Sequence, residues 1–124
     1  MSESIFKENL FEGKKVFITG GATGMGLGFA KAFLEHGADV LIASRKEENL
    51  SKAASEIKEQ TGKTLHWKMM DVRNNETVEE VAKYIKDKWG YLDVLVNNAA
   101  GNFVTPAAAM SENAWRAVID IVLD

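Results

Sequence analysis

Apolar residues follow two alternating patterns along the chain. Short runs rich in β-branched and aromatic residues end at glycine or polar positions, which is typical of buried strands. We predict four such strands, at residues 15–19 (KVFIT), 39–44 (DVLIAS), 64–70 (TLHWKMM) and 92–96 (LDVLV). The third alternates less regularly than the others.

A longer segment with helical spacing of apolar residues follows each of these strands. The first covers residues 25–36, and the first three segments are followed by Gly37, Gly62 and Gly90 as stop signals. Ser111 is a suitable N-cap for the fourth, whose apolar face contains Trp115. Four consecutive strand–helix units predict an α/β fold with parallel strand pairing and right-handed crossovers.

Length and composition restrict the function further. The 124 residues fall in the range of one domain, and the net charge of −3 gives no basic surface for nucleic acid. The chain has no cysteine, and its beginning does not resemble a signal peptide. No apolar run is long enough to cross a membrane, so we expect a cytoplasmic protein. An organelle protein whose import segment has been removed is the open alternative.

Five glycines are concentrated in the turn after the first strand, within residues 18–28 (ITGGATGMGLG). Their spacing is Thr19-Gly20-x-x-x-Gly24-x-Gly26. A helix N-terminus offers unpaired N–H groups and a partial positive charge, and glycines let the backbone approach a pyrophosphate. We therefore predict a phosphate site here. The alternative is a tight turn with a glycine-packed helix, for which fewer glycines would suffice.

Three motifs in this order resemble the short-chain dehydrogenase/reductase family. They are the glycine turn, Asp71-Val72, and the NNAAG segment at residues 97–101, and the resemblance covers nearly the whole chain after the first ten residues. It implies a Rossmann-type, doubly wound parallel sheet. The second alanine of NNAAG, the following Asn102-Phe103 and the ASRK segment at residues 43–46 resemble the 2,4-dienoyl-CoA reductase branch.

The residues after the second strand bear on the choice of cofactor. An acidic residue there would bind the adenine-ribose 2′-hydroxyl of NADH, whereas cations favour the 2′-phosphate of NADPH. This strand ends in Ser44, Arg45 and Lys46, and the first acid is Glu47. We predict NADP(H). A solvated charged loop is the alternative interpretation.

The resemblance implies roles for the other motif residues. Asp71 would accept a hydrogen bond from the adenine amino group while Val72 packs on the ring, although Asp71 can equally be a turn or N-cap residue. The NNAAG segment would brace the sheet and line the ribose and nicotinamide, and Asn102 and Phe103 would continue into the substrate cleft or form only a loop. The predicted cofactor-binding residues are Gly20, Thr23, Gly24, Met25, Gly26, Ser44, Arg45, Lys46, Asp71, Val72, Asn98, Ala99, Ala100 and Gly101.

Hydride transfer to a carbonyl or a polarised alkene also needs a proton donor. The family supplies it with a Ser and a Tyr-x-x-x-Lys pair located further along the chain, so we predict no catalytic residue within these 124 residues. Tyr84 and Lys88 match the spacing by coincidence, because they lie in the third helix, and Tyr91 precedes the fourth strand. Neither histidine has a metal-ligand pattern around it, and we predict no metal site.

These inferences combine into one functional hypothesis. Residues 1–124 would be the N-terminal, cofactor-binding part of a single reductase domain, truncated after the fourth strand–helix unit, with the strand at 92–96 left as an unpaired edge. The full-length protein would be an NADPH-dependent enzyme of fatty-acid metabolism that reduces an enoyl- or dienoyl-CoA thioester, and a homotetramer. The alternatives are a generic short-chain alcohol or 3-oxoacyl reductase, and a non-catalytic nucleotide-binding or dimerisation module.

Overall fold

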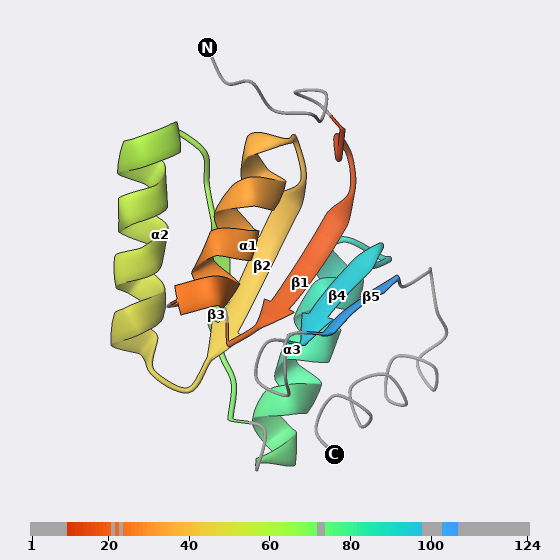
Figure 1. Ribbon diagram of the computed structural model, residues 1–124. Helices are drawn as coiled ribbons and strands as arrows, with labels where there is room; N and C mark the ends of the chain where they lie inside the picture. The colour runs from red at the N-terminus through yellow and green to blue at the C-terminus, as the bar shows by residue number, and fades with distance from the viewer. Residues whose placement is uncertain (1–9, 21, 23, 72–73, 98–102, 107–124) are drawn as a thin grey trace.

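The computed structural model describes residues 10–20, 22, 24–71, 74–97 and 103–106, the last four together with residue 97 by their backbone alone (Figure 1). Their strands form one five-stranded sheet in the order β3-β2-β1-β4-β5. The strands are β1 (Lys15–Thr19), β2 (Asp39–Ser44), β3 (His66–Met69), β4 (Val94–Asn97) and β5 (Phe103–Pro106). The first four are parallel, with Phe17 of β1 aligned with Leu41 of β2 and Leu95 of β4.

Three helices in the described part of the chain connect the parallel strands: α1 (Gly24–Glu35), α2 (Glu47–Thr61) and α3 (Asn75–Lys88). Figure 1 shows α1 and α2 on one face of the sheet and α3 on the other. The predicted stop at Gly62 is confirmed, because this residue takes the left-handed φ of 74° and its N–H donates to the Lys58 carbonyl. The helix predicted after Ser111 lies outside the described residues.

The core has two layers, separated by the sheet. Successive side chains of a strand point to opposite faces. On β1, Val16 and Ile18 are buried against α1 and α2, whereas Phe17 is buried against α3. Strands covered on both faces read as continuous apolar runs, which explains why β1 and β2 were recognisable from the sequence alone. The predicted α/β, doubly wound architecture is confirmed.

The edge of the sheet beside β4 differs from the prediction. We expected β4 to be an unpaired edge, but β5 pairs with it in antiparallel orientation, with Val96 aligned with Val104. An apolar edge strand presents unpaired N–H and C=O groups, and a nearby segment can satisfy them through a short antiparallel connection. Phe103, expected either to continue into the substrate cleft or to lie in a loop, is in a strand and is aligned with Asn97.

His66 of β3 makes the stability of this fold sensitive to pH. Burial lowers the pKa of His66 below its usual value of about 6.5, Lys88 and Lys15 lower it further, and Asp39 opposes them. The folded chain therefore binds a proton at His66 less readily than the unfolded chain does. Its stabilising contribution is complete above pH 6.5 and is lost as the pH falls through the lowered folded-state pKa.

We predict that a His66→Gln variant loses this dependence. Denaturant unfolding at pH values between 5.5 and 8 should show the free energy of unfolding of the unmodified chain declining towards pH 5.5. The His66→Gln curve should be flatter over the same range. Parallel curves for the two proteins would contradict a lowered pKa at His66.

Candidate functional site

The predicted site residues that the structure describes gather at the carboxyl ends of β1, β2 and β3, the end of the sheet towards which the arrows of the parallel strands point in Figure 1. Gly20 follows β1, Ser44 ends β2, and Asp71 comes two residues after β3. Two hydrogen bonds hold the loops side by side beyond the strands. The Gly20 N–H donates to the Ala43 carbonyl (2.8 Å), and the Met70 N–H donates to the Ser44 carbonyl (2.8 Å). Ligands of open parallel sheets bind outside the carboxyl ends of the strands.

The glycines of the turn have different structural roles. Gly20 (φ 64°) and Gly24 (φ 58°) have left-handed backbones, which glycine adopts at little cost. Leaving aside its chain neighbours and the backbone of α1 itself, a Cβ atom on Gly24 would have no heavy atom of the described residues within 4 Å, so the space beside it is open. Gly26 is buried in the helix face instead. Its burial fits the glycine-packed helix that we considered as the alternative, whereas the open space at Gly24 fits an approaching phosphate group.

The loop after β2 presents positive charge at the same edge. Ser44 is half-buried, and Arg45 and Lys46 are exposed. In the part of the chain that the structure describes, neither cation forms an ion pair with a carboxylate. Lys46 is the N-cap residue of α2, so the partial positive charge of that helix end adds to both side chains. Arg45 and Lys46 could both contact a phosphate group, and Glu47 and Glu48 in the first turn of α2 offset part of their charge.

Asp71 is fixed by its main chain rather than by a helix cap. The N-cap of α3 is Asn74, whose side chain accepts from the Glu76 N–H (3.0 Å), so the N-cap alternative for Asp71 was wrong. The Asp71 carbonyl accepts from the Asn74 N–H (2.9 Å), and the Asp71 N–H donates to the Thr77 hydroxyl (3.0 Å). Asp71 is thus a turn residue at the carboxyl edge, where the predicted contact with adenine requires it.

Several predicted residues cannot be placed. Their positions lie outside the described residues: Thr23, Val72, Asn98, Ala99, Ala100, Gly101 and Asn102. For Asn97 and Phe103 the structure gives the backbone only, in β4 and β5. Their roles remain predictions.

Sequence reasoning missed two buried threonines at this edge. The Thr19 hydroxyl lies 3.5 Å from the Val96 carbonyl and donates towards it across the β1–β4 pair, a bracing role that we had assigned to the asparagines. The Thr77 hydroxyl bonds to the main chain of Asp71. A threonine directly before the first glycine of the turn was a usable signal for Thr19. Nothing in the pattern around Thr77 distinguished it from other helix-start residues.

The two tyrosines lie away from this edge. Tyr84 is near the C-terminal end of α3, with the Lys68 and Lys88 ammonium groups 5.3 and 5.4 Å from its ring centroid. The Tyr91 hydroxyl donates to the Gly13 carbonyl (3.2 Å), just before β1 begins. Tyr91 thus lies at the amino end of β1, opposite the glycine turn, whereas Tyr84 packs against the core layer between α3 and the sheet. Across the described residues, no group of three or more His, Cys, Asp or Glu side chains could hold a metal ion.

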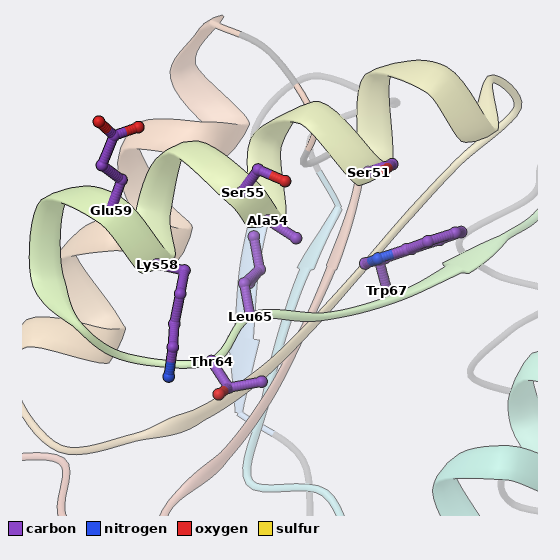
Figure 2. Close-up of a pocket in the computed structure, with 8 residues that line it drawn as sticks. All are labelled: Ser51, Ala54, Ser55, Lys58, Glu59, Thr64, Leu65 and Trp67. Atoms are coloured by element: carbon purple, nitrogen blue, oxygen red, sulfur yellow. The ribbon is translucent and has the colours of Figure 1, made fainter.

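A shallow groove lies elsewhere, between α2 and the segment entering β3 (Figure 2). In this view Lys58 extends from α2 towards Thr64, and Glu59 points away from the groove. The groove is lined by Ser51, Ala54, Ser55, Lys58, Glu59, Thr64, Leu65 and Trp67. None of these residues belongs to the predicted site.

No helix among the described residues is long and apolar enough to span a membrane.

The strand order, with helices on both faces of a largely parallel sheet, defines a Rossmann-type domain. The chain belongs to the short chain dehydrogenase family, whose sequence profile matches residues 14–124. The members of this family are oxidoreductases that use nicotinamide cofactors.

Curated relatives cover nearly all of this chain, but the chain covers much less of them. A peroxisomal 2,4-dienoyl-CoA reductase from Danio rerio is 39% identical over 94% of the chain, which corresponds to 39% of its own length. A probable 2,4-dienoyl-CoA reductase from Bacillus subtilis is 42% identical over 91% of the chain, or 44% of its length. The chain thus spans well under half of the relatives it matches.

Solved structures show the same fold. L-Sorbose reductase from Gluconobacter frateurii, determined with NADPH and L-sorbose, matches 94% of this chain and 47% of its own, with 27% identity and a TM-score of 0.71. A short chain dehydrogenase from Shigella flexneri, determined with NADP, matches 72% of this chain and 38% of its own, with 30% identity and a TM-score of 0.66.

The described residues fit such a cofactor. The open space at Gly24 admits a phosphate group to the start of α1, and Arg45 and Lys46 supply charge of the opposite sign at the same edge. When bound, a nicotinamide cofactor supplies the hydride, and these residues would bind and orient it.

Gly24 offers a direct test of the phosphate site. We predict that Gly24→Asn abolishes cofactor binding while circular dichroism keeps its α/β signature. Asparagine tolerates the left-handed backbone that Gly24 requires, so the added side chain fills the open space with little strain. Valine at this position would fill the open space and would also strain the backbone, because β-branched residues rarely adopt a positive φ.

Gly62→Asn is the matched control. Gly62 has a similar φ of 74° and open space around its missing Cβ, but it lies at the far end of α2. Its substitution should leave cofactor affinity unchanged. Equal loss of binding in both variants, or joint loss of binding and fold at Gly24, would mean that the glycine serves packing only.

Proposed function

We propose that this chain supplies the NADPH-binding part of a reductase that acts on an enoyl- or dienoyl-CoA thioester. The observation that carries the proposal is the identity of about 40% to 2,4-dienoyl-CoA reductases over more than nine-tenths of the chain. The relatives' names supply the substrate class. The cations after β2 favour NADPH over NADH.

Each group of residues at the carboxyl ends of the strands has a proposed role in binding the cofactor. The N–H groups at the start of α1 bind the pyrophosphate, with Gly24 permitting close approach. Ser44 and Arg45, with Lys46 beside them, bind the 2′-phosphate. Asp71 accepts from the adenine amino group. Asn98 to Gly101 line the ribose and nicotinamide, and Asn102 and Phe103 begin the substrate cleft.

Two alternatives belong to other substrate or function classes. The L-sorbose reductase match covers 94% of the chain at a TM-score of 0.71, so the same fold serves a carbohydrate reductase. A reductase of alcohol or 3-oxoacyl substrates would share the same cofactor motifs. A non-catalytic nucleotide-binding or dimerisation module would bind the cofactor without turnover. Turnover of dienoyl-CoA, 3-oxoacyl and alcohol substrates by the full-length protein separates these three functions.

Assembly and location complete the proposal. We propose a homotetramer for the full-length protein, which light scattering would test. The Danio rerio relative is named as peroxisomal, and our cytoplasmic assignment stays a prediction to be tested by fractionation.

For cofactor choice, we predict that Arg45→Ala weakens NADPH binding by about tenfold to a hundredfold in the full-length protein. A charge-assisted hydrogen bond contributes roughly 1.5–3 kcal/mol, which corresponds to this range. NADH lacks the 2′-phosphate, so its affinity should change little. Isothermal titration with each cofactor measures both effects.

Lys52→Ala is the control for charge alone, because Lys52 is an exposed cation on α2 outside the predicted site. It should leave both affinities unchanged. If Arg45→Ala weakened NADPH and NADH equally, Arg45 would not be recognising the 2′-phosphate.

For catalysis, we predict that the isolated 124-residue chain transfers no hydride at an enzymatic rate. Tyr91 bonds to the Gly13 carbonyl before β1, and Tyr84 packs against the core layer between α3 and the sheet, so we expect neither to act as a proton donor beside the nicotinamide. Loss of general acid catalysis alone lowers rates by about 10²- to 10⁴-fold. NADPH oxidation followed by absorbance, with dienoyl-CoA and 3-oxoacyl substrates, provides the assay.

Tyr84→Phe tests the one tyrosine with a lysine four residues later. Turnover by the purified chain that disappears in Tyr84→Phe would refute our dismissal of the Tyr84–Lys88 pair. Turnover unaffected by that substitution would instead refute the expected inactivity.

A further inference from the structure

Thr77 makes an unusual set of main-chain contacts for a residue at the start of a helix. It is 9% exposed, and its hydroxyl accepts from the Asp71 N–H at 3.0 Å. The same oxygen lies 2.9 Å from the Asp71 carbonyl and 2.8 Å from the Asn74 carbonyl, and its single proton can be donated to one of them at a time. One buried side chain thus spans the turn between β3 and α3.

Helix capping does not account for these contacts. Asn74 already caps α3 by accepting from the Glu76 N–H. The Thr77 hydroxyl instead serves Asp71, which lies beyond the last residue of β3. A half-buried N–H at this point needs an acceptor, and Thr77 supplies it. The Thr77 hydroxyl therefore holds Asp71 in place rather than capping α3.

We propose that Thr77 is a positioning residue for recognition of the adenine base. Thr77 holds the Asp71 main chain at its N–H, while the Asn74 N–H bonds to the Asp71 carbonyl, and Thr77 thereby sets the direction in which the Asp71 side chain leaves the end of the strand. This inference rests on the proposed function, in which the Asp71 carboxylate accepts from the adenine amino group. Thr77 does not itself contact the cofactor.

The base amino group provides a readout that a purely structural role would not move. We compare NADPH with its hypoxanthine analogue, in which oxygen replaces the adenine amino group. In the full-length protein, Thr77→Val should weaken NADPH by about three- to tenfold, the equivalent of one ordinary hydrogen bond. The analogue, which cannot donate from that position, should be weakened less than twofold. Thr77→Ser keeps the hydroxyl and should restore NADPH affinity.

Thr61→Val is the matched control for removing a threonine hydroxyl. Thr61 donates to the Ile57 carbonyl (2.8 Å) and accepts from the Lys63 N–H (3.1 Å), so it makes the same kinds of contact at the C-terminal end of a different helix, α2. Its substitution should leave both affinities unchanged. Circular dichroism identifies the temperature range in which every variant is folded.

Asp71→Ala separates failure of this inference from failure of the proposed function. If Thr77 acts through Asp71, Thr77→Val should have no further effect in the Asp71→Ala background. If Asp71→Ala abolished the preference for NADPH over the hypoxanthine analogue and Thr77→Val did not change it, the role of Thr77 alone would be overturned. Equal weakening of NADPH and the analogue by Thr77→Val would also overturn it. An Asp71→Ala variant that still discriminates would overturn the adenine contact itself, and absence of NADPH binding in the unmodified protein would overturn the proposed function.

Discussion

The parallel pairing of β1 with both β2 and β4 is the constraint on which the rest of this structure depends. It places β1 between two parallel neighbours, where α1 and α2 cover one face and α3 the other, and it brings the carboxyl end of β1 beside theirs. Because a parallel connection must cross over the sheet, α1 begins where β1 ends. The glycine turn, the cationic loop after β2 and Asp71 therefore share one edge as a consequence of topology.

The parts of this arrangement that depend on local sequence were predictable. β1 and β2 were predicted to the residue, because strands buried on both faces are continuous apolar runs bounded by polar residues or glycine. β3 was predicted as 64–70 but covers only His66–Met69, since it is an edge strand with a weaker burial pattern. The residues of the candidate site were chosen by motif, and the structure brings Gly20, Ser44 and Asp71 to one edge.

The parts that depend on contacts between segments were not predictable. β5 pairs with the edge of β4 that no parallel strand covers, and its four-residue sequence contains a proline and no strand-like alternation. Thr77 satisfies an N–H six residues earlier in the chain, a relation that has no periodic signature. Both cases concern backbone groups that need a partner, and such needs become visible only once the sheet has been assembled.

The candidate site is therefore organised mainly by the backbone. Gly24 and the start of α1 would bind through N–H groups whose directions are fixed by the helix, and Asp71 is fixed by bonds to its own N–H and C=O. The flexible cations, Arg45 and Lys46, are exposed, so placing a phosphate beside them requires little desolvation of buried charge. Hydrogen bonds from the Gly20 N–H to the Ala43 carbonyl and from the Met70 N–H to the Ser44 carbonyl join these loops to β2, so a bound dinucleotide would not require the sheet to reorganise.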